Sequence, residues 1–257
     1  MSLQTLSREF VTLFQQENCR GAAGLLPKIK LEYAKEGLMA PSSAFSKEDL
    51  MAARQLLEMG VLVEIHAGAS AAEIDRLFAQ LRPFYDPKLK LAASDNESKL
   101  MALHLLLLLT NNEIAEFHTE LETLSNAEND KYLQYPVKLE RWLMEGAYDK
   151  AWQAVTEKSQ FPAPEFAILT QGLQSTIRNE IAASSEKAYS SLPFANARHL
   201  LFFTSDDDLT EFAQARDWTV SNGRVNFAKV EEEEQVASTE GLISSMLAYA
   251  SQIETII

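Results

Sequence analysis

The spacing of apolar residues constrains this chain most strongly, because steps of three and four residues recur along most of its length. Such steps place side chains on one face of an α-helix. The stripes include Leu3, Leu6, Phe10 and Leu13; Leu50, Ala53 and Leu57; Ile74, Leu77, Phe78 and Leu81; Ile114, Phe117 and Leu121; and Phe166, Leu169, Leu173, Ile177 and Ile181. The pattern predicts a mainly α-helical protein in which each helix buries one face.

Residues that start and stop helices separate these stripes. Gly21 and Gly24 predict an interruption before a second helix. Ser46 is a candidate N-cap for a third helix, since a serine hydroxyl can accept a hydrogen bond from a free backbone N–H. Ser70 and Glu73 have the spacing of a capping box, in which each side chain satisfies the other residue's backbone. The chain therefore predicts separate helices rather than one long one.

The most apolar run occupies residues 105–109 and consists of leucine alone. It lies in a helix that Asp95 or Asn96 should open, and because this helix is apolar on every side we expect it at the centre of the fold. A membrane-spanning helix needs about 20 apolar residues, which is far more than this run supplies. The chain is therefore expected to be soluble, in the cytoplasm and nucleus.

Pairs of helices joined by short turns are typical of a helical solenoid. The full tetratricopeptide consensus is absent, so residues 1–160 predict an irregular TPR-like domain of helical hairpins. Gly146 is the predicted stop between two of these helices. The aromatic residues around it are better explained as the core of one hairpin than as a ligand box; they are Tyr132, Tyr135, Trp142, Tyr148 and Trp152.

The pattern changes after residue 190. Ser191 is predicted to cap a short helix, and either Thr204 or Ser205 a second helix over residues 206–216. Residues 218–227 form the one good hairpin pattern, because Asn-Gly at its centre suits a tight turn. Two short helices followed by a two-stranded ribbon predict a winged helix. Its last strand is expected to offer a free edge to a neighbouring protein through Arg224, Val225 and Phe227.

The C-terminal segment carries an excess of apolar surface. Residues 231–234 are a charged linker, and Ser238 is predicted to cap a terminal helix in which only Glu240 and Glu254 are charged. A solvated helix would show one apolar stripe with a charged back, whereas this one has two stripes. Insertion into a multi-chain helical bundle is the favoured interpretation, and packing onto its own chain is the alternative. The expected contact residues are Leu242, Ile243, Met246, Ile253, Ile256 and Ile257.

The charge of the chain disfavours nucleic acid as a partner. Its formal net charge is −14, whereas proteins that bind phosphate backbones present clustered lysine and arginine. The second helix of the predicted winged helix is itself acidic, with three consecutive aspartates at residues 206–208. A winged helix that binds protein is therefore expected, and one that binds nucleic acid is the disfavoured alternative.

Catalytic and metal-binding patterns are also lacking. Cys19 is the only cysteine, so no intramolecular disulfide can form. The segment around Ser70 has the first glycine of a nucleophile-elbow motif, Gly68, but not the last one. Residues 21–24 do not have the spacing of a P-loop. The four histidines show no metal-ligand spacing; they are His66, His104, His118 and His199. We expect no catalytic residue, no metal, no cofactor and no enzymatic activity.

Several segments resemble one known family. They are residues 135–148 (YPVKLERWLMEGAY), 177–182 (IRNEIA), 185–189 (SEKAY), 200–203 (LLFF), 216–220 (RDWTV) and 223–227 (GRVNF). They occur in the same order as in the regulatory-particle non-ATPase subunit 12 family of the proteasome, whose members carry a PCI domain. The resemblance covers nearly the whole chain and is most specific from residue 131 onward, because the first 100 residues match mainly in helix pattern.

This resemblance implies a fold and a role. It implies a helical repeat domain over residues 1–160, the winged-helix end of the PCI domain over 161–230, and a linker and assembly helix over 231–257. The role implied is that of a non-catalytic scaffold of the proteasome lid, which supports lid assembly and ubiquitin-dependent degradation. Other lid subunits, and a ubiquitin-receptor subunit, are the implied partners, without nucleic acid or membrane. The related small subunits of the COP9 signalosome and of translation initiation factor 3 remain alternatives.

Overall fold

The computed structural model describes residues 3–16, 18–35, 37, 41, 45–86, 89, 91–92, 94–124, 130–157, 159, 161–221, 223–227, 244, 246–249 and 251. The chain forms two compact units, Met1–Glu180 and Ile181–Ile257, and the division falls within one long helix.

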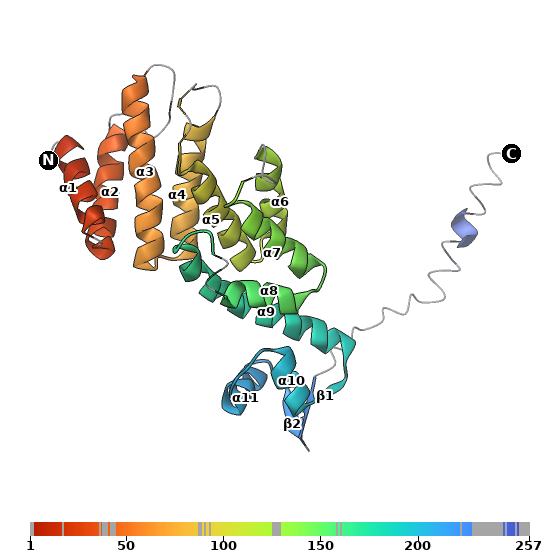
Figure 1. The fold of residues 1–257 in the computed structure, drawn as a ribbon. Coiled ribbons are helices and arrows are strands. Elements are labelled where there is room, and N and C mark those ends of the chain that lie inside the picture. Colours follow the sequence, from red (N-terminus) through yellow and green to blue (C-terminus); the bar gives the residue numbers. More distant parts are fainter. Residues whose placement is uncertain are drawn as a thin grey trace. The chain divides into compact units, whose positions relative to one another are not determined.

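The first unit is built from helices that pack against their neighbours in the sequence. Figure 1 shows α1 to α5 side by side, and α1–α2, α2–α3 and α3–α4 are in direct contact. The predicted mainly α-helical repeat is confirmed. The elements are α1 (Leu3–Gln15), α2 (Cys19–Lys35), α3 (Lys47–Ala67), α4 (Ala71–Leu81), η1 (Arg82–Tyr85), α5 (Glu97–Thr110), α6 (Ile114–Thr123), α7 (Gln134–Met144), α8 (Tyr148–Thr156) and α9 (Phe166–Ala188).

The predicted helix ends occur where local chemistry favours them. The Ser46 hydroxyl accepts a hydrogen bond from the Glu48 N–H at 3.2 Å, which caps α3. The Glu73 carboxylate accepts from the Ser70 N–H at 3.2 Å and completes the capping box of α4. Gly146 ends α7 with a φ of +71°, a left-handed conformation that costs glycine little. These termini are therefore set by nearby residues.

The expected interruption at Gly21 and Gly24 is wrong, because α2 continues through both glycines and through Pro27. A helical glycine costs about 1 kcal/mol relative to alanine, whereas burial of a large aliphatic side chain contributes roughly 1.5–3 kcal/mol. The packing of this helix offsets its poor intrinsic propensity. Its buried residues are Ala22, Leu26, Ile29 and Tyr33.

Helix α5 lies at the centre of the first unit, as its all-apolar sequence predicts. It packs against α4, α6 and α7, and Leu103 and Leu106 have no exposed surface. Helix α9 also passes close to its C-terminal end, since a Cβ atom on Gly172 would lie only 2.8 Å from the Thr110 methyl carbon. The leucine run is thus covered on several sides by its own chain.

The second unit contains a small sheet and two short helices. Its elements are β1 (Ser191–Pro193), α10 (Phe194–Leu200), α11 (Asp206–Ala215), β2 (Thr219–Ser221) and β3 (Arg224–Asn226). The sheet is antiparallel, with the strand order β1-β3-β2. The predicted hairpin is confirmed, and the two helices with the sheet make the predicted winged helix.

One boundary in this unit differs from the prediction. Ser191 does not cap a helix but begins β1, where it pairs with Asn226, and α10 starts only at Phe194. The physical reason is a partner distant in sequence, because the hydrogen bonds to β3 hold residues 191–193 extended.

Among the residues that the structure describes, no helix is both long and apolar enough to cross a bilayer.

Candidate functional site

Two of the predicted contact residues form the core of the winged helix. Val225 is completely buried and Phe227 nearly so. The Phe227 ring meets the indole of Trp218 edge-on at 4.9 Å between centroids, and Trp218 meets Phe212 in the same way at 5.7 Å. Such edge-to-face pairs add about 0.5–1.5 kcal/mol beyond the area they bury. These side chains therefore stabilise the unit itself.

The expectation that residues 224–227 provide a free strand edge is wrong. Strand β3 is the middle strand, with Val225 opposite Leu192 on one side and opposite Val220 on the other. Arg224 is exposed, but its Nη2 and Nε atoms donate to the Ser191 hydroxyl at 3.1 and 3.3 Å. The sequence could not reveal this arrangement, because the third strand comes from a segment about thirty residues earlier that lacks a hairpin signal.

The outer strands of this sheet differ from each other. All three residues of β2 are exposed, and Val220 exposes 46% of its surface. Strand β1 ends at Pro193, which has no backbone N–H to donate. Within the described residues, β2 is therefore the edge of this sheet better able to accept another strand. The hairpin pattern in the sequence predicted strand β2 but did not indicate that β2 would be the exposed edge of the sheet.

The second helix of the winged helix carries negative charge at its start. The three aspartates of residues 206–208 occupy the first turn of α11, where the positive end of the helix dipole stabilises them. Arg198 Nη1 pairs with Asp206 at 2.8 Å, and Arg216 Nη1 pairs with Glu186 at 3.0 Å. These arginines are already engaged by carboxylates. The surface of α11 is poorly suited to approach phosphates.

Glu186 joins the last turns of α9 to the sheet region. Its Oε1 atom accepts from Trp218 Nε1 at 2.8 Å and from Arg216 Nη1 at 3.0 Å. Charge-assisted hydrogen bonds of this kind are stronger than neutral ones. Glu186 thus fixes the orientation of the indole at the centre of the aromatic core.

The C-terminal segment is described only in part. Residues 246–249 are helical, and their apolar side chains lie in solvent, with exposed fractions of 68% for Met246, 66% for Leu247 and 69% for Tyr249. Five of the predicted contact residues lie outside the described residues; they are Leu242, Ile243, Ile253, Ile256 and Ile257. For the part that is described, the excess of apolar surface inferred from the sequence is exposed.

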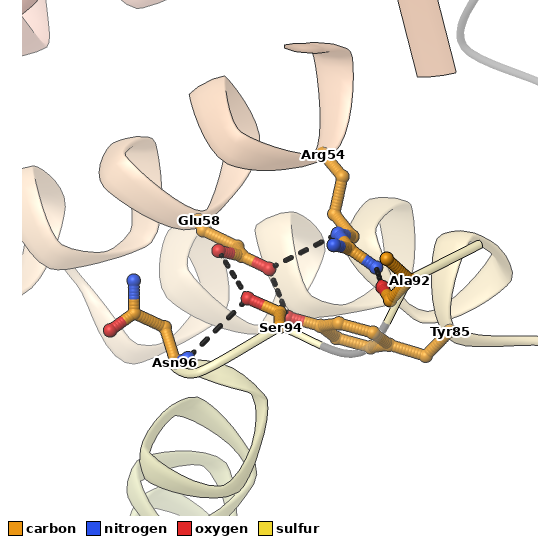
Figure 2. A network of polar contacts seen from close by, with 6 residues as sticks. All are labelled: Arg54, Glu58, Tyr85, Ala92, Ser94 and Asn96. Atoms are coloured by element: carbon orange, nitrogen blue, oxygen red, sulfur yellow. Dashed lines mark hydrogen bonds and ion pairs between the residues drawn. The ribbon is translucent and has the colours of Figure 1, made fainter. Parts of the chain in front are cut away.

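A buried polar network occupies the first unit, and Figure 2 shows how its side chains converge. Arg54 and Glu58 of α3 form an ion pair at 3.6 Å, and both are almost completely buried. Tyr85 and Ser94 each donate to the Glu58 carboxylate at 3.0 Å. Arg54 Nη1 donates to the carbonyl of Ala92 at 2.7 Å. The network therefore joins α3 to the segment that leads into α5.

Burial changes the acidity of two groups in this region, Tyr85 and Glu97. Burial raises the pKa of the Tyr85 phenol, and the nearby Glu58 carboxylate raises it further. Burial also raises the pKa of Glu97, although Arg54 opposes that change. Tyr85 consequently stays protonated and donates its hydrogen bond. The network has the donors and acceptors of a structural clamp, and sequence periodicity gave no sign of it.

Four of the residues considered for catalysis or metal binding have carboxylate partners within the fold. Ser70 bonds to Glu73 within its helix cap. Three histidines each face one carboxylate: His66 faces Glu165 at 3.9 Å, His104 faces Asp75 at 3.2 Å, and His118 faces Glu140 at 3.2 Å. Across the part of the chain that the structure describes, no three histidine, cysteine, aspartate or glutamate residues gather as metal ligands.

The two units together define a class of protein, a helical repeat that leads into a winged helix, which is the PCI-type architecture. The model of the CSN8/PSMD8/EIF3K family matches residues 95–239. That match covers more than half of the chain, including the winged helix, and this chain belongs to the CSN8/PSMD8/EIF3K family.

Three known proteins are similar to this chain over nearly the full length of both sequences. The chain is 36% identical to the 26S proteasome regulatory subunit RPN12 of Saccharomyces cerevisiae, covering 100% of this chain and 99% of that protein. It is 33% identical to the Schizosaccharomyces pombe subunit rpn12, over 95% of this chain and 96% of the relative. It is also 33% identical to the 26S proteasome non-ATPase regulatory subunit 8 homolog A of Arabidopsis thaliana, over 96% and 95% of the two chains.

Proposed function

We propose that this chain is a non-catalytic structural subunit of the lid of the 26S proteasome regulatory particle. In that role it supports lid assembly and thereby ubiquitin-dependent protein degradation. The observation that carries the proposal is the similarity over the full length of the chain to proteins named as regulatory subunits of the 26S proteasome. Because the similarity includes both units, it supports a shared role for the whole chain.

The absence of catalysis is part of the proposal and is supported by the contacts of the polar residues. Arg54, Glu58, Tyr85 and Ser94 hold one another in the buried clamp. Glu186 holds the core of the winged helix through Trp218. These groups stabilise the fold, and a scaffold needs only such groups.

The C-terminal helix is the proposed anchor to other lid subunits. Met246 exposes apolar surface that such a partner would cover. Arg224, which is exposed on the winged helix, is a second candidate contact. The proposed anchor consists of Leu242, Ile243, Met246, Ile253, Ile256 and Ile257. The proposed domains are a helical repeat over residues 1–160, the winged-helix end of the PCI domain over 161–230, and a linker with the assembly helix over 231–257. We also propose that the chain contacts a ubiquitin-receptor subunit and is located in the cytoplasm and nucleus.

A truncation tests the proposal. The chain ending at Ser238 and the full chain would each be tagged and purified from cells, and the proteins that co-purify would be identified by mass spectrometry. The full chain should bring down regulatory-particle subunits, whereas the truncated chain should remain folded and lose them. Recovery of signalosome or initiation-factor subunits with the full chain would instead favour those members of the family. Undiminished recovery with the truncated chain would remove the anchoring role.

A further inference from the structure

A small open cavity lies in the first unit where α5, α6, α7, α8 and α9 meet. Its volume is about 80 Å³, whereas sites for small molecules and cofactors usually measure roughly 300–1,000 Å³. A space of this size suits one inserted side chain. The cavity is lined by Leu109, Asn112, Ile114, Glu140, Leu143, Met144, Tyr148, Thr176, Ile177 and Glu180.

One wall of the cavity is apolar and reaches the surface at Met144. This side chain is 62% exposed and, with Leu31, is one of the two large apolar side chains that stand exposed in the described part of the first unit. Methionine is flexible and polarisable, and it is used frequently at surfaces that receive other proteins. An exposed methionine at the mouth of a cavity therefore indicates a contact surface.

The charged residues that line the cavity are both acidic, Glu140 and Glu180, beside the neutral polar residues Asn112, Tyr148 and Thr176. The Glu140 side chain is only 12% exposed, and His118 Nε2 lies 3.2 Å from its Oε1 atom. The Glu180 carboxylate accepts a hydrogen bond from Asn112 Nδ2 at 2.9 Å. No lysine or arginine lines the cavity. Two carboxylates beside an apolar wall are complementary to a cation carried on an aliphatic stem.

We propose that this cavity receives one basic side chain, lysine or arginine, from a neighbouring protein of the regulatory particle. The aliphatic stem would lie against Leu143 and Met144, and the cationic head would meet Glu140 and Glu180. This inference rests on the proposed function for the identity of the assembly. It adds a second contact, made by the helical repeat, that is separate from the C-terminal anchor.

Photocrosslinking locates the occupant directly. The full chain with benzoylphenylalanine in place of Met144 would be added to a regulatory particle purified without this subunit, and crosslinked peptides would be sequenced. A single peptide of one neighbouring protein, containing lysine or arginine beside the crosslinked residue, is expected. The same photoreactive residue at Leu31 is the matched control and should not capture that peptide. An assembled complex without a crosslink at position 144 would overturn the proposal.

Substitutions test the chemistry. Removing both charges with E140Q and E180Q should weaken binding of the full chain to the same particle by about tenfold or more, because charge-assisted hydrogen bonds are lost. E145Q, an exposed change one turn further along, should leave binding unchanged. E180Q alone, at a half-buried position, guards against misfolding and should weaken binding in the same direction.

The outcomes separate this proposal from the proposed function. If the wild-type chain fails to join the particle, the proposed function is wrong. If the wild-type chain joins and the variants without Glu140 and Glu180 charges join equally well, only the cavity proposal is wrong. Binding that is lost with M144A but retained with E140Q and E180Q would identify an apolar occupant, which also contradicts the proposal.

Discussion

Two apolar helices of this chain have opposite environments. In α5 the leucines at 103 and 106 have no exposed surface, because neighbouring helices of the same unit cover them. In the C-terminal segment, Met246 and Tyr249 expose more than two thirds of their surface. Similar side chains thus contribute to folding in one place and remain available in the other. The difference indicates that apolar composition alone does not distinguish a core from an interface.

The two helices differ in the free energy that burial of their apolar side chains contributes. Burial of one large apolar side chain contributes roughly 1.5–3 kcal/mol, and α5 obtains this from its own chain at successive positions. The described C-terminal residues obtain little of it, because Met246, Leu247 and Tyr249 stay about two thirds exposed. A partner that covered them would gain that free energy as affinity, less the cost of ordering the helix.

The largest expected effect follows from placing a charge inside α5. Leu103→Asp should abolish cooperative folding, because an unpaired carboxylate would have to enter a fully apolar site. Thermal unfolding followed by circular dichroism would reveal the loss of the transition. A variant that melts like the wild type would mean that α5 is not the core of the first unit.

A smaller but still severe effect is expected in the buried clamp. Arg54→Met should lower the free energy of unfolding by about 3–5 kcal/mol, since it leaves the Glu58 carboxylate buried without its cation. Urea unfolding would measure the change. The double variant Arg54→Met with Glu58→Gln should recover part of the loss, because no buried charge remains, and the absence of any recovery would count against an electrostatic cause.

The helix cap gives a third, modest effect. Ser70→Ala should cost about 1 kcal/mol, because the start of α4 loses the hydroxyl of its capping box. Ser46→Ala at the start of α3 is a matched comparison and should cost a similar amount. Both values can be taken from urea unfolding, and a change within about 0.3 kcal/mol of zero would show that neighbouring helices hold these termini without the caps.

The smallest effect on stability is expected in the C-terminal helix. Met246→Asp should change the free energy of unfolding by no more than about 0.5 kcal/mol, because its side chain already lies in solvent. The same variant should lose most of its co-purification with regulatory-particle subunits. A large drop in melting temperature would instead show that this helix is buried on its own chain, and the contrast with α5 would disappear.

Local features of the fold could be predicted from the sequence with good accuracy. The stripe Ile74, Leu77, Phe78 and Leu81 is buried as expected, and Ser46, Ser70 and Gly146 mark helix ends. These features depend on residues three or four positions apart. The candidate contact residues were harder to predict, because the hairpin motif indicated that β3 pairs with β2 but not that it also pairs with β1.

The helical class and most helix ends follow from the sequence, because they depend on residues within one or two turns of each other. The excess of apolar residues near the C-terminus follows from composition. Tertiary packing was needed to show that α2 continues through Gly21 and Gly24, that Val225 lies in a central strand, and that Glu58 is buried against Tyr85 and Ser94. Each of these outcomes requires a partner far away in the chain. Burial by that partner outweighs the local preference, and no local pattern records it.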